Sequence, residues 1–399
     1  EIDWRDWFEA MSRVEAILRR DPAGVYPRMD FDTRDRYRHA VEQLAEQSQL
    51  AEWEVAERAL RQCHSSENSP SGHVGYWLID EGRAFFSDAI DPRPWTLGSM
   101  LRRIVRYPGV IYACALLLAG LTAFAVPAAY LASAEASIGS WLLGIALTLL
   151  PASILSITFV NWLVTQIAPP RVLPKFEFKK GIPKDCATAV VTPVLVANAS
   201  DVPSLLQRLE AHRLANPDAA LQFVLLSDFA DADSEDMPAD DDITHALVSG
   251  VDELNRRYRD ARGDGPFHLF HRPRLYNEAQ GSWMGWERKR GKLEQFNAYI
   301  LHGISAPFSV TVGRIDALRK CRFVVTADAD TRLPPGVVRR LVGTLAHPLN
   351  RAHFDPVSGR VERGYTIIQP RVELAPDAAG QSLFSRFYGG DTAIDIYSR

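Results

Sequence analysis

Two carboxylates at the end of a short apolar run are the first residues of this chain whose spacing could do chemistry. Phe323, Val324 and Val325 form a β-type run, and Asp328 and Asp330 follow it two positions apart. Such a pair can converge on one hard cation, Mg²⁺ or Mn²⁺. The ion could bridge a diphosphate and neutralise its charge as it leaves. Two solvated turn aspartates would give the same letters.

A dense group of cations lies directly before an apolar helical stretch. Arg288, Lys289, Arg290 and Lys292 fall within five positions around Gly291. Cations near a helix N-terminus are unfavourably placed in the field of the helix dipole, and a bound diphosphate would offset this. The alternative interpretation is a solvated basic face.

Two tryptophans and a pair of aspartates complete this set of candidate residues. Trp283 and Trp286 precede the cations and could form a platform for a sugar or a base, although either could belong to the core. Asp228 and Asp231, in the run SDFAD, could accept a hydrogen bond from a nucleobase or ribose, and a surface turn is equally compatible. The three clusters would serve a nucleotide, its diphosphate and its metal if they meet in one cleft.

Strand-like and helix-like segments alternate in the part of the chain that carries these residues. The strand-like runs are 188–196, 221–226, 267–271, 322–326 (expected to be the central strand) and 365–368, and the helical runs are 202–214, 243–259, 288–302 and 335–346. This alternation predicts a mostly parallel, doubly wound α/β sheet. Ligands of such sheets bind at the carboxyl ends of the strands, where Asp228, Asp328 and Asp330 fall.

Two apolar runs, 108–131 and 139–164, contain no charged side chain, and each is long enough to cross a bilayer. Basic residues flank the pair, namely Arg102, Arg103 and Arg106 before it and Arg171, Lys175, Lys179 and Lys180 after it. The positive-inside bias places both flanks in the cytoplasm and the short loop with Glu135 outside. A buried helical hairpin of a soluble protein is the alternative.

The remaining sequence sets the domain organisation. Residues 1 to about 66 show helical periodicity and predict a packing module, with Thr33 as the N-cap of one helix. We expect a helical module and connector over 1–95, a transmembrane hairpin over 96–180 and an α/β domain over 181–399. A net charge of −4 gives no argument for nucleic-acid binding, and four scattered cysteines without a CxxC argue against a zinc site or a disulfide framework.

Several long blocks resemble the cyclic β-1,2-glucan synthases of Gram-negative bacteria. They are DPAGVYPRMDFDTRDRYRHAVE, HVGYWLID, WMGWERKRGKLEQFNAYILHG, VVTADADTRLPPG, LAHPLNRAHFD and GYTIIQPRV, and they extend over nearly the whole chain. The region 181–399 more distantly resembles the GT-A processive synthases of the cellulose synthase type. The resemblance implies a multi-pass protein of the bacterial inner membrane, with a GT-A-like glycosyltransferase domain on the cytoplasmic side.

The resemblance also implies roles for individual residues. Asp228 resembles the uridine-side aspartate, Asp328 and Asp330 match the metal-binding pair for Mg²⁺ or Mn²⁺, and Gln369-Pro370 resembles a segment near the acceptor. The residues expected to bind substrate are Asp228, Trp286, Arg288, Lys289, Gly291, Lys292 and Gln369.

The reaction implied is inverting transfer of glucose from UDP-glucose to a growing β-1,2-glucan. The protein itself would also contact membrane lipid. The superfamily's catalytic base and its Gln-x-x-Arg-Trp acceptor motif are expected beyond Arg399, followed by a glycoside-phosphorylase-like domain, so the chain reads as a fragment that is inactive by itself. Asp391 and Asp395 do not match the base motif.

Two other functions remain open. A membrane-embedded processive enzyme could make a linear polysaccharide, or the chain could be a non-catalytic nucleotide-sugar-binding scaffold subunit. A transporter is disfavoured because two spans provide too little wall for a substrate path.

Overall fold

The computed structural model describes residues 4–63, 70–91, 107–167, 172–260, 263–304, 307–371 and 382. Contacts divide the chain into two units. The first unit contains Glu1–Ala40, Ala56–Asp80 and Pro174–Pro370, and the second contains Val41–Val55, Glu81–Leu173 and Arg371–Arg399. The three-part division expected from the sequence, with boundaries near residues 95 and 180, stays a prediction.

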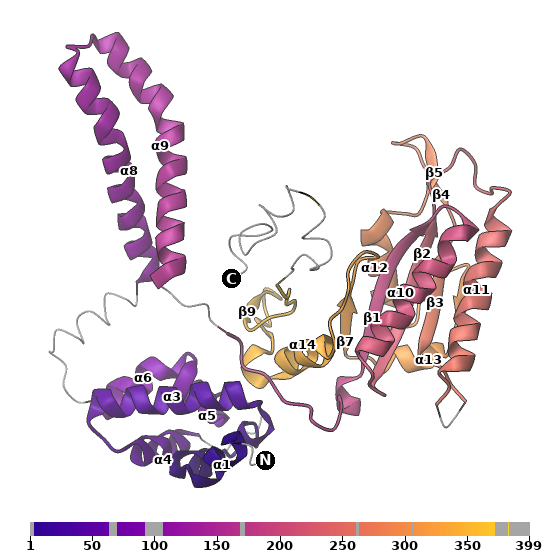
Figure 1. Ribbon diagram of the computed structural model, residues 1–399, viewed down its shortest axis with the longest axis horizontal. Coiled ribbons are helices and arrows are strands. Elements are labelled where there is room, and N and C mark those ends of the chain that lie inside the picture. The colour runs from indigo at the N-terminus through magenta and orange to yellow at the C-terminus, as the bar shows by residue number, and fades with distance from the viewer. Residues whose placement is uncertain are drawn as a thin grey trace. The chain divides into compact units, whose positions relative to one another are not determined.

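The described residues up to about 62 are mainly helical, as predicted for residues 1 to about 66, and two short helices also form in the segment expected to be a connector (Figure 1). The helices are α1 (Trp4–Met11), α2 (Arg13–Leu18), α3 (Phe31–Ser48), α4 (Glu52–Gln62), α5 (Val74–Ile79) and α6 (Gly82–Ile90), with short 3₁₀ turns at Tyr26–Arg28 and Pro70–Gly72. The predicted Thr33 cap is wrong. Asp30 caps α3, because its carboxylate accepts a hydrogen bond from the Thr33 backbone N–H at 3.1 Å. Thr33 lies in the first turn, where its hydroxyl accepts from the Lys175 backbone N–H at 3.3 Å.

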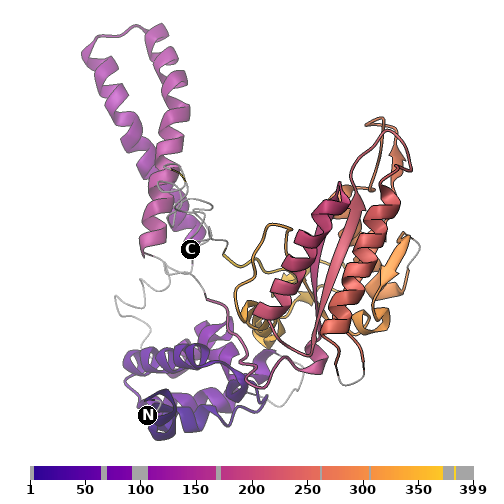
Figure 2. The same ribbon diagram turned by 45° about the vertical axis from the view of Figure 1, so that its right-hand side comes forward.

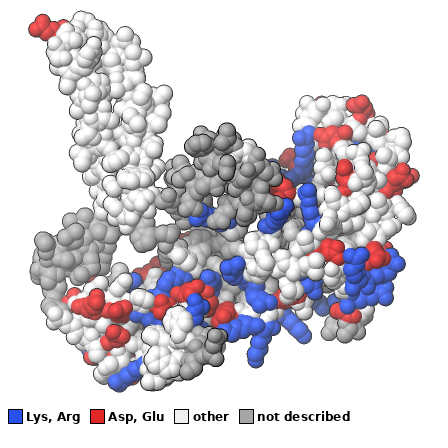
Figure 3. Space-filling view, in the orientation of Figure 1, with Lys and Arg blue, Asp and Glu red and all other residues white. Residues whose placement is uncertain are grey.

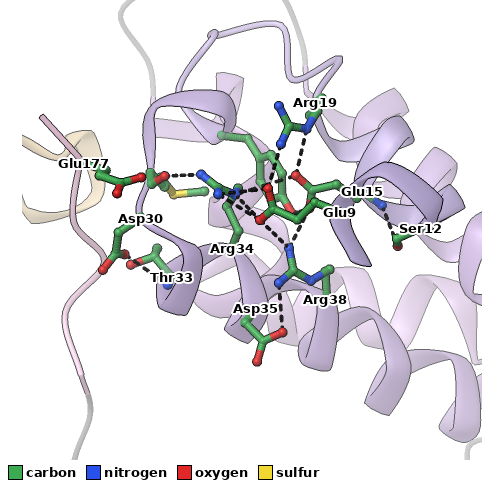
Figure 4. A network of polar contacts seen from close by, with 12 residues as sticks. Glu9, Ser12, Glu15, Arg19, Asp30, Thr33, Arg34, Asp35, Arg38 and Glu177 are labelled. Carbon is green, nitrogen blue, oxygen red and sulfur yellow. Dashed lines mark hydrogen bonds and ion pairs between the residues drawn. The ribbon is translucent and has the colours of Figure 1, made fainter. Parts of the chain in front are cut away.

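Buried charges join the first three helices (Figure 4). The carboxylate of Glu15 accepts hydrogen bonds from the Tyr26 hydroxyl at 2.7 Å and from Arg38 at 2.6 Å. Glu9 accepts from Arg34 at 2.9 Å. Burying a carboxylate is costly unless it is paired, so these guanidinium groups fix how α1, α2 and the start of α3 pack. None of the residues in this network is among the candidate site residues.

Helices α8 (Pro108–Ser133) and α9 (Ile138–Ile167) coincide with the two apolar runs. Their most apolar windows have mean hydropathies of 2.2 and 2.1 and are 0% and 17% buried. The Tyr112 hydroxyl donates to Asn161 Oδ1 at 2.8 Å, and Ala152, Ser156 and Val160 are buried. Length and composition would allow both helices to cross a membrane, and their exposed apolar faces fit membrane association.

A five-stranded sheet forms the centre of the other described region, in the order β6-β3-β2-β1-β7. Its strands are β1 (Thr188–Val196), β2 (Leu221–Phe229), β3 (Phe267–Arg272), β6 (Val310–Val312) and β7 (Phe323–Thr326). Strands β3, β2, β1 and β7 run parallel, and β6 is antiparallel to β3. The mostly parallel α/β sheet predicted from the sequence is therefore confirmed.

Helices cover both faces of this sheet (Figures 1 and 2). They are α10 (Val202–Ala215) and α11 (Asp240–Arg257) on one face, α12 (Arg288–His302) and α13 (Ile315–Leu318) on the other, and α14 (Val337–Ala346) after β7. Further 3₁₀ turns lie at Lys184–Cys186, Ala199–Asp201 and Pro348–Asn350. The core beneath α12 and α13 consists of Ala189, Val191, Val224, Leu226, Phe270, Phe296, Tyr299 and Leu318. Basic and acidic side chains are interspersed over the visible surface, except on the α8–α9 hairpin, which is almost free of them in this view (Figure 3).

The position of β7 differs from the expectation. The run 322–326 was predicted to be the central strand, but β7 lies at the edge of the described sheet, beside β1. Its burial alternates, and Val324 is 40% exposed. The period of two shows a strand covered on one face only, which the short apolar run could not distinguish from a fully buried strand.

The strand predicted at 365–368 does not form. Only Tyr365 makes an isolated bridge, to Arg351, and a hairpin of β8 (His353–Phe354) and β9 (Val361–Arg363) precedes it. Gly364 follows β9 with φ of 78°, and a Cβ there would lie 2.0 Å from the Arg351 carbonyl oxygen. This left-handed residue turns the chain and interrupts the extended run.

Candidate functional site

The carboxyl end of the sheet carries the candidate residues, as the parallel topology requires. Asp228 is the penultimate residue of β2, and Asp328 and Asp330 follow β7. After β3 the chain forms a small hairpin, β4 (Leu275–Asn277) and β5 (Ser282–Met284), and then enters α12 at Arg288. Figure 1 shows this hairpin beyond the ends of the parallel strands.

The acidic pair and the basic cluster meet at this edge. Lys289 Nζ is in direct contact with Asp328 Oδ1, and the two side chains are 55% and 53% exposed. Asp330 is exposed as well. The structure thus brings Lys289 to the carboxylate that the sequence singled out as a metal ligand.

The donor set at this edge suits a hard cation that also takes substrate oxygens. Among the residues that the structure describes, no group of three or more His, Cys, Asp or Glu side chains could hold a metal ion. Mg²⁺ is usually bound by one or two carboxylates together with phosphate oxygens and water. Asp328 and Asp330 fit that mode of binding, and the Lys289 ammonium supplies positive charge at the same place.

Helix α10 contacts the loop 328–331, which carries Asp328 and Asp330 and is called the acidic loop below. Arg208 Nη1 donates to the Ala329 carbonyl oxygen at 2.6 Å, and His212 Nε2 lies 3.0 Å from the Thr331 carbonyl oxygen. Because a carbonyl only accepts, His212 must carry a proton on Nε2. Burial lowers the pKa of His212, so the ring stays neutral and acts as a fixed donor. The loop between Asp328 and Thr331 is therefore held at two of its carbonyl groups.

Asp228 and Lys292 are both buried. Asp228 is 1% exposed and accepts two hydrogen bonds from Arg272, both at 2.7 Å. Lys292 Nζ lies 2.9 Å from Asp228 Oδ2 and donates to the Val194 carbonyl oxygen at 2.6 Å. Burial lowers the pKa of Lys292, an effect that the Asp228 carboxylate opposes. These two predicted substrate residues form a buried ion pair behind the surface that carries Lys289.

Sequence reasoning missed Arg272. It is 3% exposed, and it lies directly opposite Asp228 in the register of β2 and β3. The signal was available in the run HRPR at the end of a strand, because an arginine at one strand end can pair with an aspartate at the next. Arg274, two residues further, is also buried and pairs with Asp240 at 2.6 Å.

A tight turn presents the basic cluster. Gly291 lies against this turn, and a Cβ there would stand 2.1 Å from the Trp286 carbonyl oxygen and 2.7 Å from its ring. The predicted glycine is therefore required by close packing. Trp286 remains 42% exposed, and Arg288 reaches Asp231 at 2.6 Å.

An open pocket of about 530 Å³ lies beside this turn. Its lining residues come from the β4–β5 hairpin and the start of α12: Leu275, Tyr276, Asn277, Glu278, Ala279, Gln280, Met284, Trp286, Glu287 and Arg288. Trp283 is outside the lining and packs on Tyr276, with the ring centroids 5.5 Å apart. The pocket places an exposed tryptophan and an arginine next to the residue that contacts the acidic loop.

Gln369, the residue predicted to lie near the acceptor, makes no contact with this cluster among the described residues. Gln369 is exposed on the segment that follows β9. Asp391 and Asp395 lie outside the described residues.

Comparison with known proteins is consistent with the resemblance seen in the sequence blocks. No family model matches the chain. The chain is 35% identical over 405 residues to the protein named cyclic beta-(1,2)-glucan synthase NdvB of Rhizobium meliloti (strain 1021), a match that includes 100% of this chain. The chain spans 14% of the length of that relative.

Proposed function

The chain is a relative of cyclic β-(1,2)-glucan synthase, and from this premise we propose that its α/β part transfers glucose from UDP-glucose to a growing glucan. The donor would bind at the carboxyl end of the sheet, with its diphosphate between the acidic loop and the start of α12. The observation that carries the proposal is the contact between Lys289 and Asp328.

That contact has little value for stability. Both side chains are more than half exposed, and exposed ion pairs contribute at most about 1 kcal/mol. The buried His212 and the exposed Arg208 of α10 nevertheless hold the loop 328–331 through its carbonyl groups. Lys289 and Asp328 are thus solvent-exposed groups of opposite charge at a fixed site. Such a pair can bind a ligand that carries both a cation and phosphate oxygens.

The chemistry follows from these charges. Asp328 and Asp330 would hold Mg²⁺ or Mn²⁺, which when bound neutralises part of the diphosphate charge. Lys289 exchanges Asp328 for a phosphate oxygen and stabilises the same charge as UDP leaves. An acceptor hydroxyl attacks the anomeric carbon on the face opposite the UDP leaving group. The bond to the acceptor oxygen forms as the bond to UDP breaks. A carboxylate outside the described residues takes the hydroxyl proton.

The helices α8 and α9 would anchor this domain to the membrane. We propose that it is the bacterial inner membrane and that the basic flanks keep the α/β part on the cytoplasmic side. The relative extends far beyond the matched segment, and the catalytic base, the acceptor motif and a glycoside-phosphorylase-like domain are proposed to lie in the corresponding remainder.

The test is sugar transfer by the full-length protein in membrane vesicles supplied with labelled UDP-glucose. Asp330→Ala should abolish transfer and leave membrane insertion unchanged. Asp233→Asn, an exposed acid in the neighbouring loop, is the matched control and should keep full activity. Transfer retained by the Asp330 variant would remove the metal-site assignment, and a product without 1,2-linkages would point to a different polysaccharide.

A further inference from the structure

The turn before α12 is strained. Glu287 and Arg288 are consecutive non-glycine residues with φ of 51° and 44°. The left-handed region is unfavourable for a residue with a Cβ, and such a conformation persists only where the surroundings impose it. Because Lys289 follows directly, the direction of its side chain depends on whatever holds this turn.

Arg272 holds it. Its Nη1 donates to the Trp286 carbonyl oxygen at 3.0 Å, and its Nη2 donates to the Arg288 carbonyl oxygen at 3.2 Å. These carbonyls belong to the peptide groups before Glu287 and after Arg288, so the guanidinium binds on both sides of the strained pair. Among the described residues, no other side chain donates to either carbonyl.

The guanidinium is itself fixed from the other side. Nε and Nη2 donate to the two oxygens of Asp228, both at 2.7 Å, and Nη1 donates to Gln295 Oε1 at 2.7 Å. An arginine has five N–H donors in a rigid plane, and all five are used here. A lysine at this position could not bridge the same acceptors.

The backbone at Gly285 packs closely against the Asp228–Arg272 ion pair. A Cβ on Gly285 would lie 2.5 Å from Asp228 Oδ2 and 3.0 Å from Arg272 Nη2. The turn is thus in close contact with the buried ion pair at Gly285, which is four residues before Lys289. A shift of the ion pair would therefore displace the backbone that carries Lys289.

We propose that Arg272 is a positioning residue for the sugar-donor site. It holds the left-handed turn and so aims Lys289 at the acidic loop, although it is buried and would not touch the donor. This inference rests on the proposed function, since it is measured through binding of a nucleoside diphosphate.

The experiment is calorimetric titration of UDP, with Mn²⁺ present, into the detergent-solubilised full-length protein. Arg272→Lys should weaken UDP binding about tenfold, the effect of losing one well-placed charge-assisted contact. Arg274→Lys is the matched control, because Arg274 is also buried but its hydrogen bonds among the described residues go to Asp240 and to the carbonyls of Ala230 and Glu235. It should leave the affinity for UDP unchanged.

A rescue separates positioning from a structural role. Glycine adopts the left-handed conformation without strain, so Glu287→Gly should restore most of the UDP affinity in the Arg272→Lys background and change it little in the wild type. A residue that only stabilised the core would show no such rescue. If Arg272→Lys does not fold, Gln295→Ala takes its place, with a smaller loss of UDP affinity that Glu287→Gly should also correct.

The outcomes distinguish the two proposals. If the wild type binds UDP, Lys289→Ala does not, and Arg272→Lys binds as tightly as the wild type, the positioning role is overturned and the proposed function stands. If the wild type does not bind UDP, or Lys289→Ala binds it unchanged, the proposed function falls and the positioning role falls with it.

Discussion

Lys289 and Asp328 form an ion pair across the carboxyl end of the sheet, although they belong to α12 and to the loop after β7. Each is held by buried contacts behind it. Arg272 fixes the turn before Lys289, and His212 fixes the loop that contains Asp328. The positions of both exposed side chains are therefore set by hydrogen bonds to their backbone segments. Such preorganisation is what a site for an anion and a cation needs.

The buried pair behind this surface should dominate local stability. Asp228→Asn leaves Arg272 and Lys292 buried without a negative partner, and breaking a buried ion pair in this way costs about 3–5 kcal/mol. Asp231→Asn is the control, because Asp231 pairs with the exposed Arg288 and its loss should cost less than about 1 kcal/mol. Denaturant unfolding of the solubilised protein at pH 7 compares the two variants. Equal costs would mean that Asp228 is not the structural partner described here.

The glycine under the tryptophan should be intolerant of a methyl group. Gly291→Ala places a Cβ 2.1 Å from the Trp286 carbonyl oxygen, so the turn must move. UDP binding should weaken at least as much as in the Arg272→Lys variant, because the same turn carries Lys289. Asn297→Ala, an exposed position on the same helix, should bind UDP normally. Unchanged affinity in the Gly291 variant would show that the turn does not determine the position of Lys289.

Stability should fall as the pH drops below neutrality. Burial lowers the pKa of His271 from 6.5 to about 4, so the unfolded chain binds more protons than the folded one between these values. The stabilisation is present above pH 6.5 and is lost as the pH falls towards 4, by about 2 kcal/mol between pH 7 and pH 5.

His271→Asn removes this titrating group and should flatten the pH dependence by that amount, because an amide can still hydrogen-bond to Ser227, which lies 2.8 Å from His271 Nδ1. His245→Asn, at an exposed position of α11, is the control and should keep the wild-type slope. Thermal midpoints at pH 7, 6 and 5 provide the measurement. A slope that His271→Asn leaves unchanged contradicts the assignment.

Much of the fold could be predicted because its signals are local. The strand 188–196 and the helix 288–302 agree with β1 and α12 at every residue, since apolar periodicity and turn residues mark both ends. The two apolar runs likewise became α8 and α9. Position within the sheet is not local. Whether β7 is central or at the edge depends on which strands pair with it, and four residues carry no information about that.

The candidate site divides in the same way. The sequence identified charged residue types at strand and helix ends, and Lys289 and Asp328 do meet. It could not tell which charges face outward. Lys289 and Lys292 are three positions apart on one helix, yet Lys292 is buried against Asp228 and Lys289 is exposed. That distinction requires the register of β2 against β3, which places Arg272 beside Asp228.

The central measurement is the affinity of the solubilised full-length protein for UDP in the presence of Mn²⁺, compared between Lys289→Ala and Arg290→Ala. The two residues are neighbours with the same charge, but the Arg290 side chain is 76% exposed and, among the described residues, forms an ion pair with Glu287 alone. The account predicts about tenfold weaker binding for Lys289→Ala and unchanged binding for Arg290→Ala. Equal effects of the two substitutions, or no effect of either, would contradict it.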